Sequence, residues 1–200
     1  LGGLDNVGQS GINDNNQPGN QLAGFDLRWV SPLLHLPYAF YAQGIDEDEA
    51  NGFPANYIGL FGLEWWSTYH RLYLEMADTR SRFAHHDPEL NVAYEHSVYT
   101  SGYRYKGKSI GHTLDSDGSM WSLGWVRIEP SGSWWQWSVR RIQPDLATHQ
   151  LEEWQLGLVS AFKIKKNQLI FGWQWTYQSF FDERQQKDSL LAHIKWMYAW

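Results

Sequence analysis

The chain has no cysteine, no long apolar run and no excess of basic residues, and each absence excludes a class of protein or site. With 0 Cys in 200 residues, disulfide bonds and thiolate metal sites are excluded. Because no run of about 18 apolar residues occurs, a membrane-spanning helix is excluded as well. The 16 basic residues are outnumbered by 22 acidic ones, and the net charge is −6. This balance argues against nucleic acid as a partner, because phosphate binding needs a basic surface.

Aromatic residues are abundant instead, and they follow the period of a β-strand. The chain has 13 Trp, 11 Tyr and 9 Phe, yet its mean hydropathy is only −0.53. Apolar and polar residues alternate through most of it, which predicts strands rather than helices. Most of the predicted strands have the length needed to cross a bilayer at a tilt. They span roughly residues 22–30, 35–43, 56–66, 69–78, 119–129, 133–142, 150–162, 167–177 and 190–200.

The alternation places large apolar residues on one face of each strand and small or polar residues on the other. Near the middle of the eighth strand, Phe171, Trp173 and Trp175 share a face, whereas Gly172 and Gln174 lie on the opposite one. A soluble β-sandwich also has two unlike faces, so this pattern alone does not decide between the two folds. The rings gather toward the strand ends, where a membrane barrel has its aromatic girdles. Examples are Trp29, Trp65, Trp66, Trp175, Tyr177 and Trp200.

The connections between these strands alternate in length along the chain. They lie at 31–34, 44–55, 67–68, 79–118, 130–132, 143–149, 163–166 and 178–189, alternately short and long. Outer-membrane barrels have short periplasmic turns and long extracellular loops, whereas a sandwich has no reason to follow this rule. We therefore predict an all-β, antiparallel transmembrane β-barrel of the outer-membrane type, in which 79–118 is a long extracellular loop.

The number of strands indicates that the chain is one part of a larger barrel. Nine strands that end in the periplasm must start outside, and an isolated sheet of this kind would leave two unpaired edges in lipid. We therefore expect residues 1–200 to form a single barrel domain that is the C-terminal portion of the protein, with further strands before Leu1. Residues 1–20 are rich in Gly, Asn and Asp and are predicted to end an extracellular loop.

The last predicted strand ends in HIKWMYAW, residues 193–200, with aromatic residues at alternate positions. An alternating strand with a terminal aromatic residue is the signal that delivers barrel proteins to the outer-membrane assembly machinery. That machinery is therefore a predicted partner, recognised through Trp200. The alternative interpretation is the last core strand of a soluble β-protein.

Charged residues inside the strands alternate with apolar neighbours, so they are predicted to face the barrel lumen and to pair there or contact water. They are Asp26, Arg28, Glu64, Arg71, Glu75 and Lys195. Glu64 and Glu75 also suggest the carboxylate pair of a glycosidase, but ion pairing in the lumen is the preferred interpretation. We predict no catalytic residue, no metal site and no cofactor.

Three stretches carry a resemblance to a known family. They are YEHSVYTSGYRYKGKSIGHTLDSDGSMWSLG from Tyr94 to Gly124, PGNQLAGFDLRW from Pro18 to Trp29, and IDEDEANGFPANYIGLFGLEWW from Ile45 to Trp66. They resemble the Wzi capsule-assembly family, outer-membrane barrels of Gram-negative bacteria. The resemblance implies a single-chain barrel that acts as a lectin and holds capsular polysaccharide at the cell surface. It implies no enzymatic activity, and it places the protein in contact with outer-membrane lipid and lipopolysaccharide.

Within the long loop, the segment GYRYKGKSIGHTLDSDG, residues 102–118, is the predicted polysaccharide-binding site. Tyr and basic residues alternate at its start, so an extended segment would show rings on one side and cations on the other. Rings stack on the apolar faces of sugars, and Arg and Lys pair with uronate carboxylates through charge-assisted hydrogen bonds. The predicted site residues are Tyr103, Arg104, Tyr105, Lys106, Lys108 and His112.

Other interpretations of this segment and of the whole protein are open. Arg104, Lys106, Asp115 and Asp117 are equally able to form an internal ion-pair network that folds the loop over the barrel. The DSDG stretch at 115–118 is incomplete as a calcium loop of the EF-hand type, so a turn is predicted there. For the whole protein, the alternatives are an outer-membrane porin for small solutes and a secreted β-sandwich that binds carbohydrate.

Overall fold

The computed structural model describes most of the chain, and the regular elements in that part are β-strands. The described residues are 23–33, 36–46, 49–50, 53–54, 57–81, 90–95, 102–144, 151–165, 167–180 and 185–198. The predictions for residues 1–20 and for Trp200 fall outside these ranges. Within the described ranges, no helix is long and apolar enough to cross a membrane.

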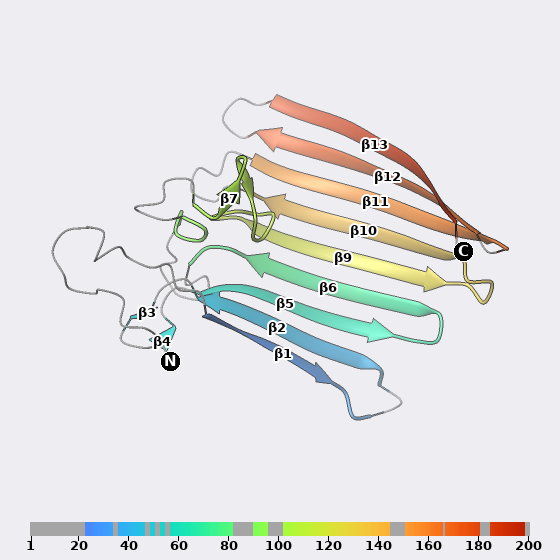
Figure 1. The fold of residues 1–200 in the computed structure, drawn as a ribbon, viewed down its shortest axis with the longest axis horizontal. Helices are drawn as coiled ribbons and strands as arrows, with labels where there is room; N and C mark the ends of the chain where they lie inside the picture. Colours follow the sequence, from blue (N-terminus) through green and yellow to red (C-terminus); the bar gives the residue numbers. More distant parts are fainter. Residues whose placement is uncertain are drawn as a thin grey trace.

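Nine strands form one antiparallel sheet, and the order of the strands in the sheet is their order in the chain. Figure 1 shows this single layer, with β1 at one edge and β13 at the other. Its strands are β1 (Ala23–Val30), β2 (Tyr38–Asp46), β5 (Tyr57–Trp66), β6 (His70–Asp78), β9 (Ser119–Ile128), β10 (Trp134–Gln143), β11 (Leu151–Ile164), β12 (Asn167–Phe180) and β13 (Gln185–Tyr198). Two small hairpins pair β3 (Glu49–Ala50) with β4 (Phe53–Pro54), and β7 (Arg104–Tyr105) with β8 (Lys108–Ser109).

The sheet confirms the predicted antiparallel all-β fold and the order of the nine predicted strands. Most strand ends agree with the prediction within a few residues. β2 covers 38–46, whereas 35–43 was predicted. Pro37 explains why the strand starts later than predicted. The Pro37 carbonyl accepts a hydrogen bond from the Trp66 N–H at 3.0 Å, but proline has no N–H to donate to the ladder of a strand.

One predicted connection was wrong. The stretch 178–189 was predicted to be a long extracellular loop, but β12 continues to Phe180 and β13 begins at Gln185. Phe180 pairs with Gln185, and Ser179 pairs with Gln186. Backbone pairing therefore extends both strands through a polar stretch that lacks apolar alternation, and only 181–184 remains between them.

The connections alternate between the two ends of the sheet. The turn end has 31–37, 67–69, 129–133 and 165–166, and the loop end has 47–56, 79–118, 144–150 and 181–184. Each connection at the loop end is longer than the turn-end connection that precedes it, as predicted, and 79–118 is by far the longest. This connection therefore contains most of the residues that link one strand to the next at the loop end.

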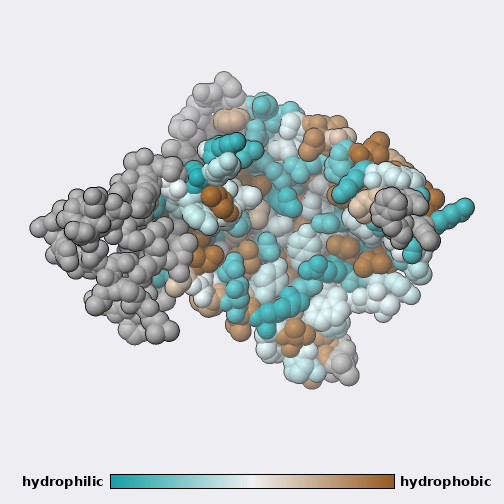
Figure 2. Space-filling view, in the orientation of Figure 1, coloured by the Kyte–Doolittle hydropathy of each residue, from teal (hydrophilic) through white to brown (hydrophobic). Residues whose placement is uncertain are grey.

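The pairing register gives the sheet an aromatic face and a polar face. Trp125, Trp137 and Trp173 share the aromatic face, where they are 37%, 45% and 37% exposed. The polar face has small or polar side chains, and Ser122 and Thr176 are buried on it. The visible side of the molecule in Figure 2 mixes teal, pale and brown side chains without a continuous brown surface.

The exposed rings agree with one of the two folds that the sequence left open. A sandwich would bury its large rings against a second sheet, but the other described sheets are two-residue hairpins, so no second layer covers the aromatic face. A membrane barrel directs such rings toward lipid. Trp29, Trp65 and Trp66 lie at strand ends, as predicted. Trp175 and Tyr177 lie inside β12 instead, because that strand continues beyond them.

Glycines on the polar face receive tyrosine rings from the neighbouring strand. A Cβ atom added to Gly62 would lie 1.9 Å from Cζ of Tyr41, and one added to Gly124 would lie 2.1 Å from Cζ of Tyr73. Each tyrosine is directly opposite its glycine in the register. The ring packs on the glycine backbone, and this contact restrains the ring. Packing of an aromatic ring on a glycine of the neighbouring strand is a known way of stabilising a sheet.

Candidate functional site

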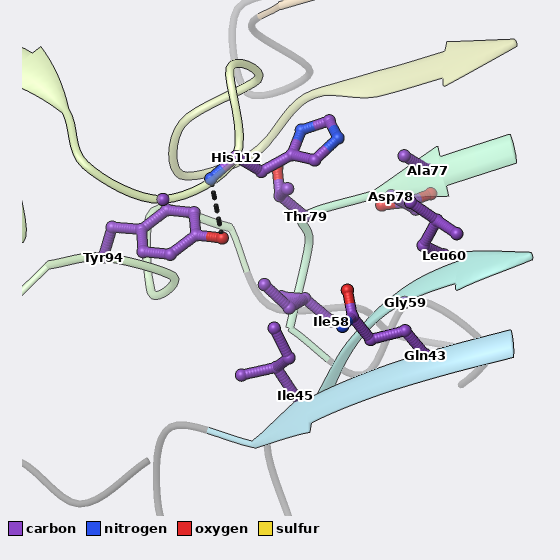
Figure 3. Close-up of a pocket in the computed structure, with 11 residues that line it drawn as sticks. Gln43, Ile45, Ile58, Gly59, Leu60, Ala77, Asp78, Thr79, Tyr94 and His112 are labelled. Atoms are coloured by element: carbon purple, nitrogen blue, oxygen red, sulfur yellow. Dashed lines mark hydrogen bonds between the residues drawn. The ribbon is translucent and has the colours of Figure 1, made fainter. Parts of the chain in front are cut away.

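The described residues of the connection 79–118, which are 79–81, 90–95 and 102–118, fold back over the polar face at the loop end. Its base is closed by two hydrogen bonds of 2.9 Å: the Thr79 N–H donates to the Gly118 carbonyl oxygen, and the Gly118 N–H donates to Thr79 Oγ1. Tyr94, Gly111 and His112 of the loop line one cavity together with residues of β2, β5 and β6 (Figure 3). The loop is therefore docked on the sheet.

The tip of the loop is a tight hairpin. β7 and β8 pair Tyr105 with Lys108, and the turn residues Lys106 and Gly107 have φ of 51° and 74°. Two central residues with positive φ form the type I′ geometry that suits a two-residue hairpin. The predicted alternation of rings and cations along an extended segment therefore holds only as far as Tyr105, and the turn interrupts it at Lys106. The turn instead brings Lys106 Nζ to 5.4 Å from the centroid of the Tyr105 ring.

Arg104 is held by carboxylates from within the same loop. Its Nε donates to Asp115 Oδ2 and its Nη2 to Asp115 Oδ1, both at 2.9 Å, and Nη2 also donates to Glu95. These bonds, with Glu95 and then Asp115 as the larger causes, raise the pKa of Arg104. The internal network considered for the sequence is thus present for Arg104 and Asp115. Glu95 completes it in place of Lys106. A turn was predicted at 115–118, and the structure has it at 113–116, two residues earlier.

Tyr94 contacts several other described residues of the loop. It is 6% exposed, and its carbonyl oxygen accepts a hydrogen bond from the Tyr103 N–H at 2.7 Å. Its ring stacks on the Tyr103 ring with centroids 6.2 Å apart and covers Gly111, where an added Cβ would lie 2.3 Å from Tyr94 Cε1. Sequence reasoning missed this role, because a buried tyrosine with φ of 63° follows no strand or helix period.

His112 stabilises the turn that follows the hairpin. Its backbone N–H donates to the Tyr94 hydroxyl at 3.1 Å, and its Nδ1 accepts a hydrogen bond from the Leu114 N–H at 3.2 Å. An accepting Nδ1 places the ring proton of the neutral imidazole on Nε2. Burial lowers the pKa of His112, and the negative charge of Glu75 offsets this only in part.

The six predicted site residues therefore divide into two groups. Tyr103 and Tyr105 are 43% and 67% exposed, and Lys106 and Lys108 are exposed beside them on the hairpin. Arg104 and His112 are half-buried and hold the loop together through the bonds described above. The structure thus presents rings and ammonium groups to solvent on a hairpin that the other two residues support.

A cavity of about 210 Å³ lies between the docked loop and the sheet. Figure 3 shows its walls: Tyr94 and His112 come from the loop, and Ile45, Ile58 and Leu60 come from the strands. Ile58 and Tyr94 also form a small buried cluster with Ala93. Sequence reasoning missed the cavity, because its residues come from five separated segments.

The charged residues predicted to face the lumen lie on the polar face. Glu64 accepts hydrogen bonds from Arg28 Nη2 at 2.9 Å and from Arg71 Nε at 2.5 Å, and Glu75 accepts one from the Tyr41 hydroxyl at 2.9 Å. The predicted ion pairing is confirmed for Glu64. Because both of its oxygens are taken by guanidinium groups, the arrangement does not support the glycosidase interpretation.

Comparisons with known proteins agree on one family. The family model for capsule assembly protein Wzi matches residues 3–128. A curated relative from Klebsiella pneumoniae, described as an uncharacterized 55.8 kDa protein in the cps region, is 38% identical over 87 residues. That match covers 41% of this chain and 16% of the relative.

A solved structure has the same fold. It is described as Wzi, an outer membrane protein involved in group 1 capsule assembly in Escherichia coli and a carbohydrate-binding β-barrel. It matches this chain with a TM-score of 0.72 and 22% sequence identity, over 94% of this chain and 45% of the solved chain. The chain therefore spans less than half the length of this relative, and its sheet has the fold of a section of that barrel.

Proposed function

Because the chain belongs to the Wzi capsule-assembly family, we propose that it is part of an outer-membrane barrel that binds capsular polysaccharide and holds it at the cell surface. The aromatic face would contact lipid, and the loop end would lie outside the cell. The barrel would also meet lipopolysaccharide in the outer leaflet.

The observation that carries this proposal is the exposed hairpin at residues 103–108. Tyr105 presents most of its ring to solvent, and rings of this kind stack on the apolar faces of sugars. Lys106 and Lys108 add cations that suit an acidic polymer. The scaffold beneath is already ordered by Arg104 and Tyr94, so binding would cost little further loss of conformational freedom.

The docked loop favours binding over solute conduction, the other function considered for such a barrel. The loop covers part of the polar face at the loop end, where Tyr94 and His112 contact the same cavity as strand residues. A chain folded over the entrance to a lumen restricts passage. It also holds the hairpin at a position that a surface polymer can reach.

A triple substitution of the exposed hairpin residues tests the proposal. In the full-length protein, Tyr105→Ala, Lys106→Ala and Lys108→Ala together should release capsule from cells into the medium. Tyr69→Ala is the matched control, because Tyr69 is 46% exposed but lies in the turn-end connection 67–69. If a folded triple variant retains capsule as well as the wild type does, the hairpin is not the binding site.

A further inference from the structure

The cavity beneath the docked loop has an aliphatic floor and a polar mouth. Ile58 and Ala77 are 5% and 1% exposed and form the floor. Gln43 and His112 are half-buried and lie closer to solvent. At about 210 Å³ the cavity is smaller than the roughly 300–1,000 Å³ of a pocket for a drug-sized ligand, so it suits one sugar unit or a substituent of it.

Gln43 supplies a hydrogen-bond acceptor to this cavity. Its Nε2 donates to Asp26 Oδ1 at 2.8 Å, and a carboxylate accepts only from the NH₂ side of an amide. The amide is therefore oriented with its NH₂ group on Asp26, and Figure 3 shows the Gln43 oxygen directed toward the middle of the lining residues. That oxygen is able to accept an N–H.

His112 supplies a donor. Because its Nδ1 accepts from the Leu114 N–H, the proton of the neutral ring lies on Nε2. Nε2–H is therefore able to donate to a carbonyl oxygen. The hydrogen bond from the Leu114 N–H fixes the orientation of the ring, and His112 lines the cavity.

The charges around the cavity disfavour an anionic group. No Lys or Arg is among the described residues that line it. Asp78 does line it, but its carboxylate is occupied by Arg80, whose Nε donates to Asp78 Oδ1 at 3.0 Å and whose Nη2 donates to Oδ2 at 2.5 Å. A uronate would find no unpaired cation among these described lining residues, whereas a neutral group with a methyl end would match the aliphatic floor.

We propose that this cavity is the subsite for the acetamido group of an N-acetylated sugar. The acetamido N–H would donate to Gln43 Oε1, its carbonyl oxygen would accept from His112 Nε2–H, and its methyl group would pack on Ile58 and Leu60. The inference rests on the proposed binding of capsular polysaccharide, and it adds the class of sugar that the site selects.

The test uses the purified full-length protein in detergent micelles, with N-acetylglucosamine and glucose as probes. Saturation-transfer NMR should show the strongest transfer to the acetyl methyl group. N-acetylglucosamine should bind about tenfold more tightly than glucose, because glucose has no acetamido group to pair with His112 Nε2–H and Gln43 Oε1. Equal binding of the two sugars by the wild type would overturn the proposal, whatever any variant does.

Two matched pairs of variants locate the effect. Leu60→Phe fills the cavity and should abolish transfer to the methyl group, whereas Leu63→Phe makes the same change on the aromatic face of the same strand and should not. His112→Asn keeps an acceptor for the Leu114 N–H but removes the Nε2 donor, whereas His112→Gln retains an N–H near that position. Preference for the acetylated sugar should fall in the Asn variant more than in the Gln variant, and no difference between folded His112 variants would contradict the assigned donor.

A second readout separates this inference from the proposed function. Polysaccharide retained by the wild type without any preference for N-acetylglucosamine would refute the acetamido subsite and leave capsule binding intact. Preference for N-acetylglucosamine without binding of capsular polysaccharide would support the subsite chemistry and refute its proposed use in capsule binding.

Discussion

The backbone N–H of His112 donates to the hydroxyl oxygen of Tyr94 at 3.1 Å, and this bond joins two parts of the loop that are 18 residues apart. The same tyrosine stacks on Tyr103 and covers Gly111. One buried residue thus connects the hairpin, the following turn and the sheet. The exposed hairpin depends on this connection for its position.

Removing only the Tyr94 hydroxyl should loosen the loop and leave the sheet unchanged. Tyr94→Phe keeps the ring but leaves the His112 N–H without its acceptor, which typically costs about 1 kcal/mol. Hydrogen exchange of residues 103–114 should become faster, while exchange in β9 and β10 stays slow. Unchanged exchange in the loop would show that this bond does not hold it.

Adding a methyl group at Gly124 should destabilise the barrel. The new Cβ would lie 2.1 Å from Tyr73 Cζ, so the ring must move, and overpacking of this kind typically costs about 1–3 kcal/mol. Gly124→Ala should lower the urea concentration at which the folded barrel is lost. The double variant Tyr73→Ala with Gly124→Ala should behave differently from the sum of the two single variants, and strict additivity would argue against the ring-on-glycine contact.

Docking of the loop should weaken as the pH falls below about 6.5, the pKa of a histidine in the open loop. Burial lowers the pKa of His112 in the docked state, so the open state binds more protons in the window below that value. Above it both states are neutral and docking has its full strength. Protonation of Nδ1 also removes the acceptor for the Leu114 N–H.

Limited proteolysis within 103–114 measures this opening. Cleavage in the wild type should increase from pH 7.5 to pH 5.5, and the His112→Asn variant should lose most of that dependence because its side chain does not titrate. An equal dependence on pH in both proteins would assign the effect to other groups.

The orientation of the sheet predicts which positions are accessible on living cells. In a cysteine-free full-length background, Ile110→Cys should react with a membrane-impermeant thiol reagent on intact cells, because Ile110 is 56% exposed at the loop end. Ser131→Cys, in the turn-end connection 129–133, should react only after the outer membrane is permeabilised. The reverse pattern would invert the proposed topology.

The strands were predictable because their signal is local. Phe171 and Trp173 alternate with Gly172 in the sequence, which predicts that they lie on opposite faces of the strand. The observed register keeps them on opposite faces. The start of β13 was missed because Gln185 and Gln186 carry no alternation. They are in a strand because their backbones pair with Phe180 and Ser179, a property of the partner strand.

The loop was less predictable, since its contacts join residues that no period relates. Two interpretations of Arg104 were open in the sequence, and the path of the chain brings it to Glu95 as well as Asp115. The cavity has the same origin, because Gln43 and His112 line it together although they are far apart in the sequence. Tyr103 and Tyr105, in contrast, were singled out by their alternation with basic residues, and the structure leaves both rings exposed. Their role in binding remains a prediction.

Direct binding of purified capsular polysaccharide by the purified full-length protein tests the central claim. Wild-type protein in detergent micelles should bind the polymer. The triple variant Tyr105→Ala, Lys106→Ala and Lys108→Ala should bind it at least about tenfold more weakly. The Tyr69→Ala control should bind it as tightly as the wild type does. A loss of this size corresponds to about 1.4 kcal/mol, which is modest for one ring and two cations. Wild-type protein that does not bind the polymer, or a folded hairpin variant that binds it equally well, would contradict the claim.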